Sequence, residues 1–249
     1  MPDERQEETP SRPRVRDWTP LYVPAAIVIA GILIGGGLFL GLSRTGGSGA
    51  PVAKAVNIKD VNIDGNPYVG KQDAPVVLAF WADYQCPFCR AVEIGHPQIQ
   101  TPPAVPDLIK QYVDTGKLKI VFKDYPFLGE DSITDGEYAR AVWDLYKSQY
   151  FAFRSALYEA QDEEGDQGFG DAASVDKLIK NKFPQFDLGK IKEAVATNKA
   201  KYDSAMTADR DEGTKFGIQG TPGFITGKTL IDGAQPLSAF VSAIDAQLK

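Results

Sequence analysis

The sequence predicts an α/β fold in which two sheet-forming parts are separated by a long helical segment. Three observations carry this prediction. An apolar, β-rich run at 75–81 precedes a helical pattern and a second alternating run at 117–124. Helical periodicity then occupies about 131–215, and residues 223–249 return to a short hairpin and a helix. We therefore expect a β–α–β unit, a helical insertion and a closing β–β–α unit.

The segment before this domain has two different compositions. Residues 1–17 are polar and rich in Pro, Arg and Glu, which predicts a disordered tail. Residues 18–43 carry no charge, and their apolar part, 21–42, is as long as the roughly 20 residues that span a bilayer as a helix. Trp18 and Tyr22 stand at one end of the run, where interfacial aromatic residues belong. We expect residues 18–43 to be a single transmembrane anchor.

The basic residues around this segment predict its orientation. Four arginines precede it, which favours a cytoplasmic N-terminus and an extracytoplasmic C-terminal domain: Arg5, Arg12, Arg14 and Arg16. A cleaved signal peptide is the alternative, with Ala53–Ala55 as a weak cleavage match. The apolar run is longer than the usual roughly 7–15 residues of a signal peptide, so an uncleaved anchor is favoured. Residues 44–55 contain Gly46–Gly49 and are expected to be a flexible linker.

The first part of the domain, residues 56–249, is predicted as follows. Val56 to Asp64 alternates in polarity before a turn, which predicts an edge strand. The strand at 75–81 leads into a helix that prolines interrupt and that resumes near Pro106. Residues 117–124 then form a second strand, and a connection of this length predicts a parallel crossover.

The rest of the chain is helical until its last strands. A helical stripe from Tyr138 to Tyr146, then two shorter helices and one longer helix are expected before residue 215, with Asp187 as a candidate N-cap of the longer one. The acidic, Gly-rich stretch 161–171 is expected to be a loop. Strands at 223–226 and 229–231 flank Gly227-Lys228, and residues 235–249 are predicted to form a helix.

Cys86 and Cys89 are the only cysteines of the chain, and two residues separate them. A Cys-x-x-Cys between a strand and a helix is typical of a redox dithiol. The unsatisfied N–H groups and the partial positive charge of a helix N-terminus stabilise a thiolate, so the pKa of the first cysteine falls to roughly 3.5–7.5 in such sites.

Other interpretations of the pair are weaker. A structural zinc site needs four ligands, and the chain offers these two thiols and His96. Residues 60–65 match half of a calcium loop, but Lys71 stands where the last carboxylate belongs. A permanent disulfide over two residues would constrain the unfolded chain little. We expect no metal and no cofactor, and the net charge of −6 does not support a nucleic-acid partner.

Two segments carry a family resemblance. The segment from Phe80 to Cys89, FWADYQCPFC, resembles the active site of the membrane-anchored bacterial DsbA-like thiol–disulfide oxidoreductases. Gly217 to Pro222, GIQGTP, is similar to that family's cis-proline loop. The resemblance covers about residues 57–249. It implies a thioredoxin fold with an inserted helical domain, and a cis Thr221–Pro222 bond that packs against the dithiol and holds substrate polypeptide.

Two departures from the family pattern affect the expected chemistry. Many oxidising members have histidine between the cysteines, whereas the dipeptide here is Pro87-Phe88. The Phe88 side chain donates no hydrogen bond to a thiolate, so a milder oxidant is expected. Relatives often place an acid six residues before the first cysteine, where this chain has Phe80. Asp83 is the candidate substitute for that acid.

The resemblance implies an extracytoplasmic oxidase that introduces disulfides into exported proteins. Cys86 would be the exposed nucleophile and Cys89 the buried resolving thiol, and a membrane quinone-linked oxidoreductase would restore the disulfide. One alternative is a membrane-tethered reductase or isomerase of the same fold. Another is a non-enzymatic thioredoxin-fold assembly factor, for which the dithiol and Thr221-Pro222 would be needless.

Overall fold

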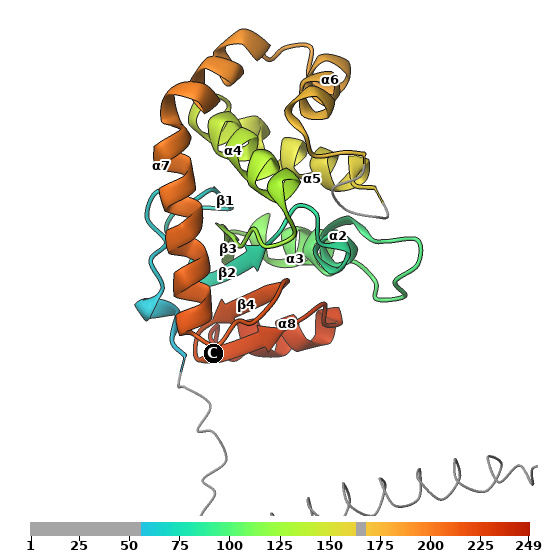
Figure 1. Ribbon diagram of the computed structural model, residues 1–249. Coiled ribbons are helices and arrows are strands. Elements are labelled where there is room, and N and C mark those ends of the chain that lie inside the picture. The colour runs from blue at the N-terminus through green and yellow to red at the C-terminus, as the bar shows by residue number, and fades with distance from the viewer. Residues whose placement is uncertain (1–55, 163–167) are drawn as a thin grey trace, which may run out of the picture. The chain divides into compact units, whose positions relative to one another are not determined.

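The computed structural model describes residues 56–162 and 168–249 (Figure 1). The predicted tail, anchor and linker, residues 1–55, lie outside the described residues. No helix within the described ranges has both the length and the apolar character needed to cross a bilayer.

A five-stranded sheet with the order β1-β3-β2-β4-β5 forms the centre of the domain. The strands are β1 (Tyr68–Val69), β2 (Val76–Ala82), β3 (Leu118–Asp124), β4 (Gly223–Thr226) and β5 (Thr229–Asp232). β2 and β3 run parallel with Val76 opposite Leu118, as predicted, and the other neighbours are antiparallel. Because β4 lies beside β2, the chain before Gly223 reaches the end of β2 at Trp81.

Helices surround the sheet and build the predicted helical insertion. Between β2 and β3 come α2 (Pro87–Ile94), α3 (Val105–Leu108) and the π-helical turn η2 (Ile109–Val113). The insertion consists of α4 (Glu130–Leu145), η3 (Lys147–Gln149), α5 (Tyr150–Ala160), α6 (Ala172–Lys182) and α7 (Leu188–Lys215). α7 packs against α4 and returns along β3 and β2 (Figure 1). Asp187 caps α7 by accepting a hydrogen bond from the N–H of Lys190, as predicted.

The two faces of β2 pack into different clusters, because successive side chains of a strand point to opposite faces. Leu78 and Phe80 belong to the larger cluster, which continues into the helical insertion. Ala79 and Trp81 belong to a smaller cluster with Val56, Val61 and residues that follow α7. All four of these β2 side chains are fully buried, so the strand that leads to the cysteines is held on both faces.

The N-terminal part of the domain differs from the prediction. Val56 to Asp64 is no edge strand: it contains η1 (Ile58–Asp60), a 3-10 turn whose N-cap Asn57 accepts a hydrogen bond from the N–H of Lys59. The edge strand is β1, ten residues further on. The Asn57 side chain caps the 3-10 turn, and the backbone groups of Asn62 bond to Glu212 and Lys123. These hydrogen bonds compete with strand pairing. The last helix, α8 (Leu237–Asp245), is shorter than predicted.

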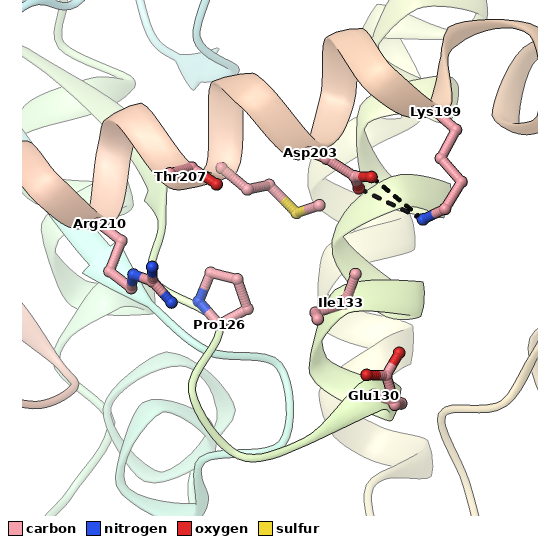
Figure 2. Close-up of a pocket in the computed structure, with 8 residues that line it drawn as sticks. Pro126, Glu130, Ile133, Lys199, Asp203, Thr207 and Arg210 are labelled. Atoms are coloured by element: carbon pink, nitrogen blue, oxygen red, sulfur yellow. Dashed lines mark hydrogen bonds and ion pairs between the residues drawn. The ribbon is translucent and has the colours of Figure 1, made fainter.

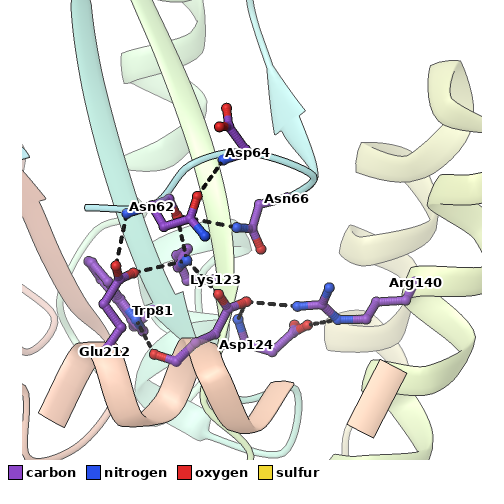
Figure 3. A network of polar contacts seen from close by, with 9 residues as sticks. Asn62, Asp64, Asn66, Trp81, Lys123, Asp124, Arg140 and Glu212 are labelled. Atoms are coloured by element: carbon purple, nitrogen blue, oxygen red, sulfur yellow. Dashed lines mark hydrogen bonds and ion pairs between the residues drawn. The ribbon is translucent and has the colours of Figure 1, made fainter. Parts of the chain in front are cut away.

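A buried polar network joins this N-terminal segment to β3, α4 and α7 (Figure 3). Asp209 of α7 pairs with Lys123 and Arg140, and Arg140 also bonds Asp124 at 2.6 Å. Lys123 donates to the carbonyl oxygen of Asn62 at 2.7 Å, and the side-chain nitrogen of Trp81 donates to the carbonyl oxygen of Asp209 at 2.8 Å. The network thus connects the segment around Asn62 with β2, β3, α4 and α7, which are distant in the sequence. Its members are Asn62, Trp81, Lys123, Asp124, Arg140, Asp209 and Glu212.

Candidate active site: a dithiol at a helix N-terminus

The cysteine pair lies where β2 ends and α2 begins. Cys86 is the N-cap of α2 with φ −79° and ψ 119°, and its carbonyl oxygen accepts from the N–H of Arg90 at 3.1 Å. Pro87 occupies the first helical turn, where its missing N–H costs no hydrogen bond. Cys89 follows on the buried side of the same turn. This position places both sulfurs at the end of the helix that favours negative charge.

Both cysteines are free thiols, and both are buried. Cys89 is 0 % exposed, as expected for the resolving thiol, but Cys86 is 3 % exposed. The expectation of an exposed Cys86 is therefore wrong for this reduced state. The reason is that its sulfur is covered by the loop that precedes β4, while the neighbouring Phe88 is 51 % exposed. Cys86 nevertheless remains the more accessible sulfur of the pair.

The loop that covers Cys86 ends in Thr221–Pro222, and this peptide bond is cis, as the resemblance implies. The Cys86 Sγ lies 3.3 Å from the carbonyl oxygen of Thr221. Pro222 is buried and directly precedes β4, so its missing N–H removes no hydrogen bond from the sheet. The pairing of β4 with β2 is what brings residues 135 positions apart into contact.

The pKa values of the two thiols are shifted in opposite directions. A hydrogen bond from the Cys89 thiol lowers the pKa of Cys86 to about 7, against the opposing effect of burial, and the N–H groups of Phe88 and Cys89 contribute in the same direction. Burial raises the pKa of Cys89 well above its ordinary value. The buried Thr221 hydroxyl makes no hydrogen bond of ordinary geometry, yet its proximity lowers the pKa of both thiols. Cys86 is thus the thiol of the pair that ionises more easily at neutral pH.

The Asp83 carboxylate, the candidate substitute for the missing acid, lies among donors from the active-site turn, the loop after β3 and α4. It accepts four hydrogen bonds: from the N–H group of Gln85 within the turn at 2.8 Å, from the N–H groups of Phe127 and Leu128 in the loop at 2.9 and 3.2 Å, and from the Ser132 hydroxyl of α4 at 2.7 Å. Burial raises its pKa against these bonds. Because its oxygens are occupied by these donors, Asp83 acts as a structural support for the turn.

Sequence reasoning missed a contact between the active-site turn and the helical insertion. The Gln85 side chain donates to Asp135 of α4 at 2.7 Å and to the carbonyl oxygen of Phe169 at 3.0 Å. Asp135 is fully buried, and burial raises its pKa well above the ordinary value. No local pattern marks this pair, because Asp135 reads as one more polar residue in a helix. The contact fixes the residue that immediately precedes Cys86.

The described part of the chain has no cluster of side chains suited to a metal ion: no three His, Cys, Asp or Glu side chains are grouped there so that they could hold one. His96 instead accepts a hydrogen bond from the N–H of Gln98. A pocket of about 170 Å³ lies between α7 and the segment after β3, with the Lys199–Asp203 ion pair at its edge (Figure 2). It is lined by Pro126, Glu130, Ile133, Lys199, Asp203, Met206, Thr207 and Arg210.

Comparison with known proteins decides the family. A family model described as thioredoxin matches residues 62–246, which is most of the chain. The chain belongs to the thioredoxin family. Within this family it is similar to the probable disulfide bond formation protein D of Bacillus anthracis, with 26 % identity over 182 residues, 73 % of this chain and 77 % of the relative.

Solved structures of thioredoxin-family proteins share the fold. BdbD from Bacillus subtilis in its oxidised form has a TM-score of 0.65 and 24 % identity, and the match covers 79 % of this chain and 98 % of that one. The thiol–disulfide exchange protein α-DsbA2 from Wolbachia pipientis has a TM-score of 0.59 and 28 % identity, over 73 % of this chain and 86 % of that one. The chain is a DsbA-like thiol–disulfide oxidoreductase with a helical insertion.

Proposed function

We propose that this oxidoreductase introduces disulfides into exported proteins through Cys86 and Cys89, on the extracytoplasmic side of a membrane. The observation that carries the proposal is the difference between the two thiols. Cys86, at the N-terminus of α2, has a pKa of about 7, whereas burial keeps the pKa of Cys89 well above its ordinary value. This difference gives each sulfur one part in disulfide exchange.

The reaction proceeds in two exchanges. A substrate thiolate attacks Cys86 in the Cys86–Cys89 disulfide, a substrate–Cys86 bond forms, and the electron pair of the broken bond passes to Cys89. A second substrate thiolate then attacks the substrate sulfur of this mixed disulfide, and Cys86 leaves as a thiolate. The substrate dithiol loses two electrons and two protons, and the protein gains them as its dithiol. A quinone-linked membrane oxidoreductase is the proposed acceptor that regenerates the disulfide.

Polypeptide substrates fit the surface beside the dithiol. Phe88, Phe127 and Leu128 are 51 %, 49 % and 36 % exposed, and they are three of the few large apolar side chains exposed in the described part of the chain. Asp83 holds the N–H groups of Phe127 and Leu128 at the end of β2, where the cysteines follow. These exposed apolar side chains, together with the backbone carbonyl of Thr221, favour binding of an extended polypeptide segment over binding of a small polar thiol.

Whether the protein acts as an oxidase or as a reductase depends on how strong an oxidant the Cys86–Cys89 disulfide is. Of the two residues between the cysteines, Phe88 contributes its backbone N–H to Cys86, Pro87 has none, and the Phe88 side chain supplies no donor. A pKa of about 7 matches the roughly 7 of thioredoxin, whereas that of DsbA is about 3.5. A less stabilised thiolate makes the reduced form less favoured. We therefore propose a mild oxidant.

The direction of the reaction is tested by equilibrating the full chain, in detergent, with glutathione buffers and trapping the free thiols. We expect a reduction potential between the roughly −270 mV of thioredoxin and the roughly −120 mV of DsbA. A double Cys86→Ser/Cys89→Ser variant is the control for trapping at other groups. A potential at or below that of thioredoxin would mean that the protein is a reductase and that the proposed direction is wrong.

The proposed location rests on residues 1–55. We propose a cytoplasmic tail at 1–17, a membrane anchor at 18–43 that contacts lipid through 21–42, a linker at 44–55 and an extracytoplasmic domain at 56–249.

Cell fractionation tests this arrangement. We expect the full chain in the membrane fraction after alkaline washing, with its domain open to protease added outside the cytoplasm. A variant without residues 18–43 should leave the membrane fraction. Recovery of the full chain in the soluble fraction would contradict the anchor, and adding a quinone to the isolated membranes should raise the oxidised fraction of the dithiol if the partner is quinone-linked.

A further inference from the structure

A buried ion pair lies beneath the active-site helix. Glu93 is four residues after Cys89, so the two side chains share one face of α2, and both residues are almost completely buried. Arg154 of α5 donates from Nε to both Glu93 oxygens, at 3.0 and 2.8 Å. Burying this ion pair costs free energy of desolvation. Neither residue takes part in the exchange steps described above.

The guanidinium group of Arg154 stands in a cage of aromatic rings behind the dithiol. Its Cζ atom lies 4.3 to 5.3 Å from the ring centres of Phe80, Tyr84, Phe122 and Tyr158. Phe80 is the residue at the position where relatives often carry an acid. Two further donors of Arg154 bond hydroxyl oxygens, from Nη1 to Tyr84 at 3.2 Å and from Nη2 to Tyr158 at 3.1 Å.

The Tyr158 hydroxyl connects this cage to the cysteines. It donates a long hydrogen bond of 3.4 Å to the carbonyl oxygen of Asp83, and the same carbonyl accepts the N–H of Cys86 at 3.2 Å. Because Arg154 donates to the hydroxyl oxygen, the hydroxyl proton is available to an acceptor in the active-site turn. Burial is the main cause that raises the pKa of Tyr158, and negative charge at Cys89 raises it further, as expected for neighbouring groups.

We propose that Tyr158 is the hydrogen-bond donor that stabilises Cys89 as a leaving thiolate, and that Arg154 is the positioning residue that holds it. When a thiolate attacks Cys86, the electron pair of the disulfide passes to Cys89, which is fully buried. The Tyr158 hydroxyl then turns from the Asp83 carbonyl to the Cys89 sulfur. Tyr158 keeps its proton, and the proton that neutralises Cys89 comes from solvent. The inference rests on the exchange activity and holds for either direction of the reaction.

The test measures rates and the equilibrium separately in the full chain in detergent. Oxidised Tyr158→Phe is reduced with dithiothreitol. Reduced Tyr158→Phe is mixed with glutathione disulfide, and the closure in which Cys89 displaces glutathione from Cys86 is followed as the loss of the mixed disulfide. We expect the second-order rate constant of reduction and the first-order rate constant of closure to fall about tenfold, the loss of one hydrogen bond to a charged group, and the equilibrium with glutathione to change less than twofold. The equilibrium is preserved because Cys89 is uncharged in both the disulfide and the dithiol.

Tyr150→Phe is the matched control, because it also removes a buried hydroxyl of the same cluster, one that bonds the Tyr84 hydroxyl at 3.1 Å. Its rates should stay within twofold of the parent. Arg154→Lys is the second variant: it keeps the positive charge, replaces the fork of donors by one nitrogen, and should slow both reactions as Tyr158→Phe does. Parent-like rates in Tyr158→Phe, equal slowing in Tyr150→Phe, or a shifted equilibrium with unchanged rates would each overturn the proposal.

Discussion

Cys86→Ser is expected to remove all measurable disulfide exchange, whichever direction the reaction takes. The thiolate is the nucleophile, and the serine hydroxyl does not ionise near neutral pH or form the mixed disulfide. The oxidised state also cannot form, because Cys89 is the remaining thiol and is 0 % exposed. The measurement is the oxidation of a reduced, unfolded substrate protein by a stoichiometric amount of the full chain. Retention of parent activity would exclude Cys86 as the attacking sulfur.

Cys89→Ala is the companion variant that separates the roles of the two sulfurs. Its Cys86 thiolate should still attack the disulfide of an oxidised substrate protein and release one substrate thiolate. The resulting substrate–Cys86 mixed disulfide should accumulate, because no Cys89 is present to displace the substrate, and it would be visible as a covalent adduct on a non-reducing gel. The hydrogen bond from Cys89 is the largest cause that lowers the pKa of Cys86 to about 7. Alkylation of Cys86 in the reduced parent should therefore rise with a midpoint near pH 7, and in Cys89→Ala the midpoint should move to higher pH. Unchanged midpoints would contradict this electrostatic assignment.

Local patterns predicted the elements that position the dithiol. The apolar run before the cysteines, the alternating strand near 120 and the final hairpin each appear in the sheet within a residue or two of their predicted bounds. The Cys-x-x-Cys spacing was itself sufficient to predict sulfurs at a helix N-terminus. The cis bond at Pro222 depended on the family resemblance, because a sequence of this kind does not by itself distinguish cis from trans.

The groups around the dithiol could not be predicted, because they come from distant parts of the chain. Arg154 and Glu93 are 61 residues apart, and Gln85 and Asp135 are 50 apart. In the sequence each looks like an ordinary polar residue on a helix, and only the docking of the helical insertion on α2 and the turn buries it. The low exposure of Cys86 has the same origin, since the covering residue Thr221 is 135 positions away.

Loss of the Asp209 side chain is expected to reduce the stability of the domain strongly. Its carboxylate is shared by Lys123 and Arg140, and one of its oxygens also accepts the N–H of Asp124 at 3.2 Å. Burial raises the pKa of Asp209 even with two cations beside it, so the cluster already has a desolvation cost. A buried charge cluster of this kind contributes little net stability when intact. Breaking it is costly, because the partners remain buried.

Asp209→Ala should therefore lower the free energy of unfolding by about 3–5 kcal/mol, the usual cost of removing one partner from a buried ion pair. For a domain of this size that corresponds to a fall of roughly 6–20 °C in the thermal midpoint. Asp211→Ala is the matched control, because Asp211 is on the same helix and exposed, and it should stay within about 0.5 kcal/mol of the parent. Asp209→Asn, which keeps the shape and one acceptor, should lie between the two.

The Asp209 variants should lose thermal stability but keep the disulfide-exchange activity of the folded protein. The network bonds α7 to β3, α4 and the segment around Asn62 (Figure 3). None of its members is hydrogen-bonded to the sulfur of Cys86 or Cys89. At temperatures below the midpoint, exchange activity per folded molecule should equal that of the parent. A midpoint for Asp209→Ala that matches Asp211→Ala would show that the cluster does not clamp the insertion to the sheet. A loss of exchange activity in the folded variant would instead show that the clamp also sets the position of the active-site turn.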